Sequence, residues 1–447
     1  MRKYLQPVAF LVLAVVAAAS MWFYVIGILR AHQIADAEAK QIPRGNLSDL
    51  YPRWLGAREL LLHHRNPYSR ELTLEIQESY YGRRLDPARA NDPKDQQGFA
   101  YPVYVVFLLA PLIGLRFATL QIIFYWLLAV LTGMSVWLWL RVLRWHLPAI
   151  MVAACVTLTL GSFPAIQGIR LQQLSLLVAA LLAGAVACAA RGWLLAGGML
   201  LALATIKPQL TWLLVAWLLW WAMSDWRTRR KLVVGFAAVM ALLLVGAEIV
   251  LPGWWHMFVQ GVRQYQQYTQ NQSVLEVMLD QILGTSLGAA LGHAGGEILA
   301  GIAVLACVPI LWNLRHAPSG ALGFGRATTL VLALSVLVVP MYAPYNQILL
   351  LPAIFLLVQS KDTFLGRSRS ARLAYFAGAF AVGYQWVASV VLLFGYFLFS
   401  RAWALKAWTA PLFCSLALPI LVFALTLLEF QAARQGPRLQ VSSATID

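Results

Sequence analysis

Charged residues are scarce in this chain of 447 residues, and acidic residues are scarcer than basic ones. Only 12% of the residues are Asp, Glu, Lys or Arg, whereas soluble domains carry roughly 25%. Apolar residues instead reach 61%, and the mean hydropathy is +0.70. A soluble protein of this length has no means of hiding so much apolar surface, so the composition excludes that class and indicates a polytopic membrane protein.

Cysteine is also rare, and nucleotide-binding motifs are absent. The four cysteines lie in apolar runs, which favours small core residues over a disulfide framework or a metal site. His63 and His64 are adjacent, so they point to different faces of a helix and lack the i, i+4 spacing of a metal pair. No Walker motif, glycine-rich nucleotide loop or Ser–His–Asp spacing occurs. The sequence therefore gives no support to ATP or a nucleotide sugar, and we predict no metal and no cofactor.

The excess of basic residues points to lipid. The chain has 34 Lys and Arg against 18 Asp and Glu, a net charge of +16. Basic clusters at 225–231, 361–372 and 434–438 flank apolar segments, as expected where cytoplasmic loops meet anionic headgroups. No nucleic-acid-binding module accompanies them. The charge therefore indicates a bilayer as the partner and not a nucleic acid.

The apolar segments predict an all-α transmembrane bundle of about twelve spans, within limits of ten and thirteen, that forms one integral-membrane domain over residues 1–447. The first apolar run is too long for a typical signal peptide, so we expect an uncleaved span with its N-terminus in the cytoplasm. An even number of spans puts the basic clusters and a cytoplasmic basic tail, 431–447, on one side. The predicted spans lie near 8–29, 100–117, 119–140, 148–166, 171–190, 193–222, 232–251, 285–314, 326–340, 345–359, 373–398 and 408–430.

Residues 30–98 are predicted to form a large first extracytoplasmic loop. Two stretches in it, LYPRWLGARELLLHH at 50–64 and SRELTLEIQESYYGRRL at 69–85, repeat apolar residues at intervals of three and four. This spacing predicts two short amphipathic helices at the membrane surface.

Asp49 in this loop has two interpretations. Ser48 and Asp49 precede an amphipathic segment, which makes Asp49 a candidate helix N-cap. Alternatively, a carboxylate beside arginines suits a transferase that uses a lipid-phosphate donor, because the carboxylate takes a proton from the acceptor hydroxyl while the arginines stabilise the departing phosphate. Glu59 and Glu71 are weaker candidates, since each lies on a helical face that is predicted to be exposed.

Lys207 lies inside a long apolar run, directly before Pro208. A charge in the middle of a membrane costs roughly 2.5–3.5 kcal/mol on insertion scales, and a proline frees backbone carbonyls. Lys207 therefore either faces the bundle interior and binds a phosphate, or extends from a helix end to the interface. Two interpretations also exist for the polar side chains in QGIRLQQLSLL and PMYAPYNQILLLP: they either lie at helix ends or the membrane edge, or they bind a sugar.

In their order along the chain, these motifs resemble the bacterial integral-membrane glycosyltransferases of the GT-C fold, in particular the polyprenyl-phosphate-mannose-dependent alpha-mannosyltransferase family. The likeness covers about residues 5–360. Ser175 departs from the family pattern, which has Asn there, and Tyr345 to Gln347 replace histidines that some members carry. The matching pieces are Asp49, RNPYS (65–69), FAYPVYVVFLLAPL (99–112), QQLSLL (172–177), AGGMLLALATIKPQ (196–209) and APYNQILLLPA (343–353).

The resemblance implies transfer of a sugar, with mannose expected, from a polyprenyl-phosphate donor to a glycan or glycolipid acceptor on the extracytoplasmic side of the bacterial inner membrane. It implies that Asp49 is the general base of an inverting single displacement. Cationic side chains neutralise the leaving phosphate, so this mechanism needs no metal. We assign the donor phosphate to Lys207, Arg44, Arg53, Arg58 and Arg170, and the sugar and acceptor to Tyr101, Gln172, Gln173, Tyr345, Asn346 and Gln347.

Two other functions fit the same architecture. A transporter of lipid-linked sugars or envelope polymers needs acidic and basic residues in paired broken helices, whereas the sequence has one Lys–Pro interruption and no internal repeat. A non-catalytic subunit of envelope glycan synthesis would use Asp49 only as a helix cap.

Overall fold

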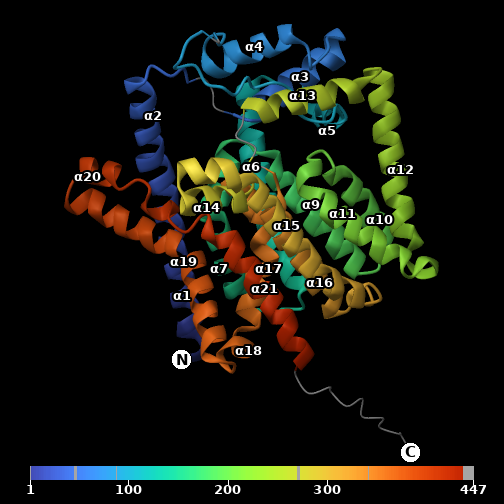
Figure 1. Ribbon diagram of the computed structural model, residues 1–447, viewed down its shortest axis with the longest axis vertical. Coiled ribbons are helices and arrows are strands. Elements are labelled where there is room, and N and C mark those ends of the chain that lie inside the picture. The colour runs from blue at the N-terminus through green and yellow to red at the C-terminus, as the bar shows by residue number, and fades with distance from the viewer. Residues whose placement is uncertain (1, 45–47, 87, 269–271, 341, 436–447) are drawn as a thin grey trace, which may run out of the picture.

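A computed structural model of the chain describes residues 2–44, 48–86, 88–268, 272–340 and 342–435, and these residues form helices and no strands (Figure 1). The helices are α1 (Arg2–Phe23), η1 (Tyr24–Leu29), α2 (Arg30–Ala39), α3 (Tyr51–His63), α4 (Arg70–Tyr81), α5 (Val105–Leu109), η2 (Ala110–Leu112), α6 (Phe117–Val142), α7 (Ala149–Leu160), α8 (Phe163–Arg170), α9 (Leu174–Ala190), α10 (Leu194–Ala204), α11 (Pro208–Met223), α12 (Trp226–Val250), α13 (Trp254–Tyr268), α14 (Val274–Leu283), α15 (Thr285–Leu314), α16 (Leu322–Val338), η3 (Pro344–Leu350), α17 (Leu351–Gln359), α18 (Lys361–Leu365), α19 (Arg369–Leu398), α20 (Arg401–Lys406), η4 (Ala410–Leu412) and α21 (Ala417–Gln435).

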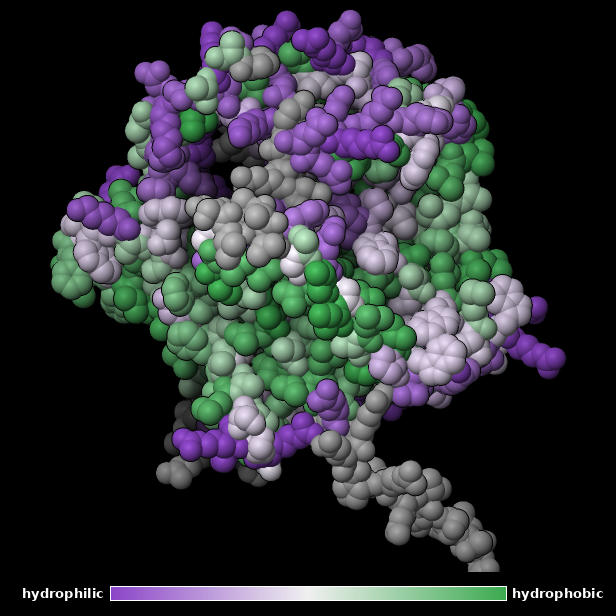
Figure 2. Space-filling view, viewed as in Figure 1, coloured by the Kyte–Doolittle hydropathy of each residue, from purple (hydrophilic) through white to green (hydrophobic). Residues whose placement is uncertain are grey.

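Apolar residues form a band across the middle of the face shown in Figure 2. The long helices also carry exposed large apolar side chains, such as Leu242 on α12 and Phe397 on α19, which are 71% and 70% exposed. Helices α3, α4 and α13 cover one end, and the start of α1 and the end of α21 lie at the other (Figure 1). Among the described residues, six helices are long and apolar enough to cross a membrane, or seven with the bent pair α7–α8. The chain is therefore a multi-pass membrane protein.

The predicted count of about twelve spans stays a prediction, because several predicted spans differ from the helices observed. The first apolar helix continues from Gln6 to Ala39, beyond its predicted end. Residues 100–117 contain only the short helices α5 and η2, and the predicted span at 193–222 is divided into α10 and α11. The predicted cytoplasmic tail lies outside the described residues from residue 436 onward.

Helices α3 and α4 occupy the two amphipathic segments of the polar loop. Ser69 caps α4, since its hydroxyl oxygen accepts from the Leu72 N–H, and Gly82 ends the helix with a φ of +81°. The residue at the N-cap of α3 is Leu50, and no side chain caps that helix. Asp49 is therefore not the helix cap that one interpretation of the sequence allowed.

Three interruptions of the apolar helices meet inside the bundle. They separate α8 from α9, α10 from α11, and α16 from η3. Proline opens two of the following helices, as Pro208 in α11 and Pro344 in η3, where its missing N–H costs nothing. Backbone groups freed by such breaks need partners in an apolar phase. The hydroxyl of Tyr104 supplies one by donating to the Thr205 carbonyl at 3.0 Å, which fixes the break before Lys207.

Close contact with α12 fixes the position of α10, the helix that ends at the break before Lys207. A methyl group at Gly198 would collide with the carbonyl oxygen of Leu232, and one at Gly235 with the carbonyl oxygen of Leu195. Small residues at both positions therefore let the two backbones touch, as is common between membrane helices.

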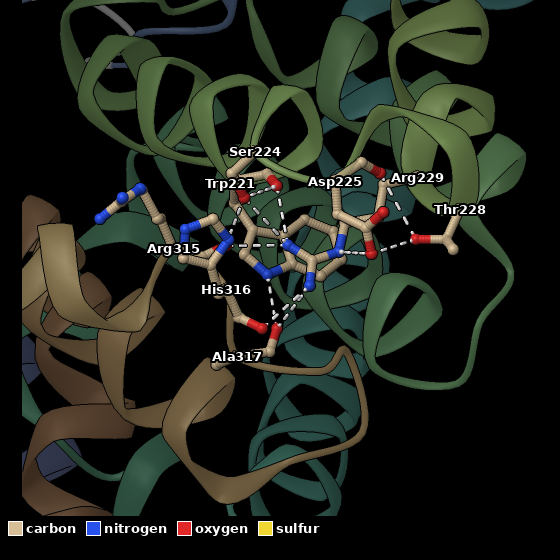
Figure 3. A network of polar contacts seen from close by, with 8 residues as sticks. All are labelled: Trp221, Ser224, Asp225, Thr228, Arg229, Arg315, His316 and Ala317. Carbon is tan, nitrogen blue, oxygen red and sulfur yellow. Dashed lines mark hydrogen bonds and ion pairs between the residues drawn. The ribbon is translucent and has the colours of Figure 1, made fainter.

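A buried arginine ties three helices together at the end of the bundle away from α3 and α4 (Figure 3). Arg229, near the start of α12, donates to the carbonyl oxygens of Trp221 and Arg315 at 2.8 Å each, and to Ala317 at 3.0 Å. It also stacks on the Trp221 ring, with its guanidinium carbon 4.1 Å from the ring centroid. The Trp221 carbonyl lies in the last turn of α11, and those of Arg315 and Ala317 follow the end of α15. Arg229 thus satisfies groups that a helix C-terminus leaves unpaired.

We predict that Arg229→Met lowers the free energy of unfolding by about 3 kcal/mol, because several buried carbonyls lose a charged donor at once. Thermal unfolding of the detergent-solubilised protein measures the change. The neighbouring Arg230 is exposed, so Arg230→Met is the matched control and should leave the midpoint nearly unchanged. Equal midpoints for the two variants would contradict this role of Arg229.

Candidate active site

A cavity of about 350 Å³ lies where the polar loop and α13 meet the helix breaks. Its walls come from the loop before α3, from α3 and α4, from residues 95–102, from the ends of α9 and α11, from α13 and from η3. The polar and aromatic lining residues are Asp49, Arg53, Tyr80, Asp95, Gln97, Tyr101, Gln173, Lys207, Gln209, Phe258, Tyr265, Gln266 and Tyr345.

Asp49 is fixed at this cavity by its backbone and by its carboxylate. Its N–H donates to the carbonyl of Leu171 at 2.9 Å, which attaches the polar loop to the break between α8 and α9. The hydroxyl of Tyr80 donates to one carboxylate oxygen at 3.2 Å, and the side-chain amide of Gln173 donates to the other. A hydrogen bond to each carboxylate oxygen therefore fixes the orientation of the Asp49 side chain.

Gln173 also connects Asp49 to Lys207. Its amide oxygen accepts from the Lys207 ammonium at 3.3 Å, while its NH₂ group faces the Asp49 carboxylate. Only this orientation of the amide satisfies both neighbours, because an ammonium is purely a donor and an ionised carboxylate purely an acceptor. One amide thus lies between a cation and an anion without letting them form a direct ion pair.

Lys207 is 3% exposed and is held by the two other helix breaks. Its ammonium donates to the hydroxyl of Ser175 at 2.6 Å, and that hydroxyl donates to the Asn346 side-chain oxygen at 2.9 Å. The ammonium also lies 5.1 Å from the centroid of the Tyr345 ring. Lys207 therefore faces the bundle interior. An ammonium has three donor hydrogens, and its hydrogen bonds to described residues leave the third for a ligand.

Arg53 brings a second cation to the cavity. Its guanidinium lies 4.5 Å above the Tyr101 ring centroid, and its Nη1 donates to the backbone carbonyl of Asp49 at 3.0 Å. The stacking and the hydrogen bond hold the guanidinium beside Asp49 without pairing it to the Asp49 carboxylate.

A second carboxylate, Asp95, lines the same cavity, and sequence reasoning missed it. The backbone N–H and the side-chain amide of Gln97 donate to its two oxygens at 2.9 and 2.8 Å. Its backbone carbonyl accepts from the Tyr81 hydroxyl at 2.8 Å. The only signal was a carboxylate directly before the Tyr–Pro stretch, in a segment that was interpreted as a break between helices. Tyr80 and Tyr265 were missed as well, because nothing local separates them from other residues of amphipathic helices. Gln209 was also missed, although a polar side chain two residues after Lys207 in an apolar run was a signal that could have found it.

The electrostatic surroundings of Asp49 favour a proton acceptor that is stronger than an ordinary carboxylate. Burial raises the pKa of Asp49, and the negative charge of Asp95 raises it further. The charges of Arg53 and Lys207 and the hydrogen bond from Tyr80 act in the opposite direction. Burial also raises the pKa of Asp95. The negative charge of Asp95 therefore acts on Asp49 across the cavity that they share.

The structure brings six of the twelve predicted site residues to the cavity: Asp49, Arg53, Tyr101, Gln173, Lys207 and Tyr345. Asn346 lies one hydrogen bond away, behind Ser175. Gln172 supports the loop from behind, since its amide oxygen accepts from the Ser48 hydroxyl at 2.6 Å.

Four predicted residues lie away from the cavity lining. Gln347 donates to the carbonyl of Ser415 at 2.7 Å. The guanidinium of Arg58 lies 5.5 Å from the ring centroid of Trp54. Arg44 lines a separate hollow with residues of α2, and Arg170 donates to the carbonyl of Val25 at 3.5 Å.

The arrangement suits a reaction in which a proton is removed while negative charge develops nearby, because a carboxylate and two cations line one cavity. Asp49 is oriented to accept a proton. Lys207 and Arg53 offer positive charge to a departing anion. The amides and hydroxyls between them suit a ligand with many hydroxyl groups.

One family of proteins matches this chain. A family model described as glycosyltransferase family 87 matches residues 99–340, which is more than half of the chain. The matched range contains Tyr101, Gln173 and Lys207, and it begins after Asp49 and ends before Tyr345. No curated protein and no solved structure matches the chain significantly.

We predict that Asp95→Asn lowers the pKa of Asp49, because it removes the negative charge of Asp95, which disfavours ionisation of Asp49. A carbodiimide reacts with the protonated carboxyl group, so modification of Asp49, mapped by peptide mass spectrometry, should reach its midpoint at lower pH in the variant. Asp36 is exposed on α2 and pairs with Lys40, which makes Asp36→Asn the matched control. An unchanged or higher midpoint in Asp95→Asn would show that the two carboxylates are not coupled.

Proposed function

The chain belongs to glycosyltransferase family 87, and from that membership we propose that it transfers a sugar from a polyprenyl-phosphate donor to a glycan or glycolipid acceptor. The observation that carries this proposal is the link from Asp49 through Gln173 to Lys207 on the wall of one cavity. A carboxylate and an ammonium separated by one amide side chain support the roles of proton acceptor and phosphate-binding cation that we propose for them.

In the proposed reaction, a hydroxyl of the acceptor attacks the anomeric carbon of the donor sugar. The bond from that carbon to the phosphate oxygen breaks, and the polyprenyl phosphate leaves with the electron pair. Asp49 takes the proton from the attacking hydroxyl, and the configuration at the anomeric carbon inverts. Tyr80 and Gln173 orient the carboxylate for this transfer, and the raised pKa of Asp49 makes it a better general base.

Lys207 and Arg53 stabilise the leaving phosphate. Both are cations at the cavity wall, and neither forms an ion pair with a carboxylate among the described residues. The amide of Gln173 separates the ammonium from Asp49, so the positive charge stays available to the phosphate. These side chains supply the charge that the departing phosphate requires, and the proposed mechanism accordingly uses no metal.

The donor sugar occupies the region of the cavity lined by amides and phenols. Tyr101, Gln173 and Tyr345 were predicted for this role, and Gln209 and Tyr265 add to them. Side chains of this kind suit sugar hydroxyls because they both donate and accept hydrogen bonds. We propose mannose as the sugar on the basis of the sequence resemblance.

We place the cavity on the extracytoplasmic side of the bacterial inner membrane. It lies under the polar cap of α3, α4 and α13, at the end of the bundle away from the start of α1 (Figure 1). The basic clusters at 225–231 and 361–372 belong to the opposite end, where positive residues favour the cytoplasm. A total of about twelve crossings requires that the shorter apolar helices also span the membrane.

We predict that Asp49→Asn reduces sugar transfer about 10²- to 10⁴-fold, as expected for loss of a general base, while the folded protein remains. The test uses purified protein in liposomes, radiolabelled polyprenyl-phosphate-mannose and a mixed pool of envelope lipids, with an elution profile to verify folding. Asp36→Asn is the matched control and should retain wild-type transfer.

Two results would contradict the proposal. Equal transfer by wild type and Asp49→Asn would remove Asp49 from the chemistry. Absence of transfer by the wild type with several polyprenyl-phosphate sugars would favour a transporter of lipid-linked sugars instead.

A further inference from the structure

Three arginine side chains gather beside the active site but outside its cavity. Arg30 at the start of α2 and Arg44 beyond its end line a hollow of about 480 Å³, and Figure 2 shows the surface hollowed beside α2. Arg170, the last residue of α8, donates to the carbonyl of Val25, which precedes Arg30 in the same continuous helix. The cluster Arg30–Arg44–Arg170 is thus assembled from three separate segments.

These three cations repel one another. The pKa of Arg44 is lowered by burial and then by the positive charge of Arg30, and both Arg30 and Arg44 act on the charge of Arg170. Glu38 lines the same hollow, yet no carboxylate of a described residue forms an ion pair with any of the three. Like charges that are partly removed from water are unfavourable unless an anion joins them. The cluster therefore has the character of an anion site.

The cluster borders the general base. Arg170 directly precedes Leu171, whose carbonyl accepts from the N–H of Asp49 at 2.9 Å. Tyr80, which donates to the Asp49 carboxylate, also lies near Arg44. The long apolar helix that begins at Gln6 carries Arg30 at the start of its polar last segment, where a membrane-spanning helix is expected to reach the lipid headgroups.

We propose that Arg30, Arg44 and Arg170 bind the phosphate of a second lipid, an anionic acceptor, and hold its headgroup hydroxyl at Asp49. The acceptor role rests on the proposed function. In a single displacement the hydroxyl attacks the face of the sugar opposite the leaving phosphate, and Lys207 and Arg53 already serve that phosphate inside the cavity. A separate phosphate site outside the cavity, next to the base, suits the molecule that supplies the nucleophile. Guanidinium groups suit this ligand because they bind phosphate through two parallel hydrogen bonds.

A binding measurement tests the site without any transfer of sugar. The full-length protein in detergent is titrated with dihexanoyl-phosphatidylglycerol, an anionic short-chain lipid, and with zwitterionic dihexanoyl-phosphatidylcholine. The anionic lipid should bind more tightly, and Arg44→Gln and Arg170→Gln should each weaken its binding about tenfold. Arg170→Lys keeps the charge and should lose less, which separates loss of binding from loss of folding. Arg84 is exposed and pairs with Glu78, so Arg84→Gln is the control with the same change of charge.

A kinetic measurement then separates the two lipid phosphates. Arg44→Gln should raise KM for an anionic acceptor lipid about tenfold and leave KM for the polyprenyl-phosphate donor unchanged. A rise in the donor KM alone would overturn the acceptor assignment and give the cluster to the donor phosphate. Equal lipid binding by wild type, Arg44→Gln and Arg170→Gln would overturn the site itself. Normal lipid binding without any sugar transfer would instead count against the proposed function and leave the anion site intact.

Discussion

The ammonium of Lys207 is the contact on which the other elements of the site converge. It donates to Gln173 and Ser175 at one helix break, and through Ser175 it is connected to Asn346 at another. A charge buried in an apolar bundle is costly unless it is hydrogen-bonded on several sides. Lys207 lies at one break, and the side chains of Gln173, Ser175 and Asn346 at the two other breaks supply these hydrogen bonds directly or through Ser175. Bringing the breaks together therefore satisfies the hydrogen bonding of the lysine.

The hydrogen bonds of Gln173 also determine how charge is arranged in the cavity. Gln173 presents its oxygen to Lys207 and its NH₂ group to Asp49, so a cation and a carboxylate remain close without neutralising each other. A direct ion pair between them would leave less charge for a ligand. Arg53 adds charge next to the base through its hydrogen bond to the Asp49 backbone. The structure of this glycosyltransferase family 87 member thus separates its charges by amide and phenol side chains.

Some of these features were predictable from sequence. A charged residue before a proline in an apolar run identified Lys207, and a carboxylate among arginines identified Asp49. Order along the chain cannot show which arginines turn toward the cavity, since Arg53 does and Arg44, Arg58 and Arg170 do not. Asp95 was missed because residues 95–102 lie beside Asp49 only in the folded chain, where both carboxylates line one cavity. The predicted spans at 100–117 and 193–222 failed because hydropathy reports burial in apolar surroundings and does not distinguish a broken or short buried helix from a full span.

The roles of Lys207, Arg53 and Asp49 can be tested together in a structure of the full-length protein bound to a polyprenyl phosphonate sugar, in which carbon replaces the scissile oxygen. Phosphonate oxygens are expected about 2.7–2.9 Å from the Lys207 ammonium and the Arg53 guanidinium, with the anomeric carbon turned toward Asp49. A phosphonate bound outside this cavity, with Lys207 still paired only to Gln173 and Ser175, would contradict these roles.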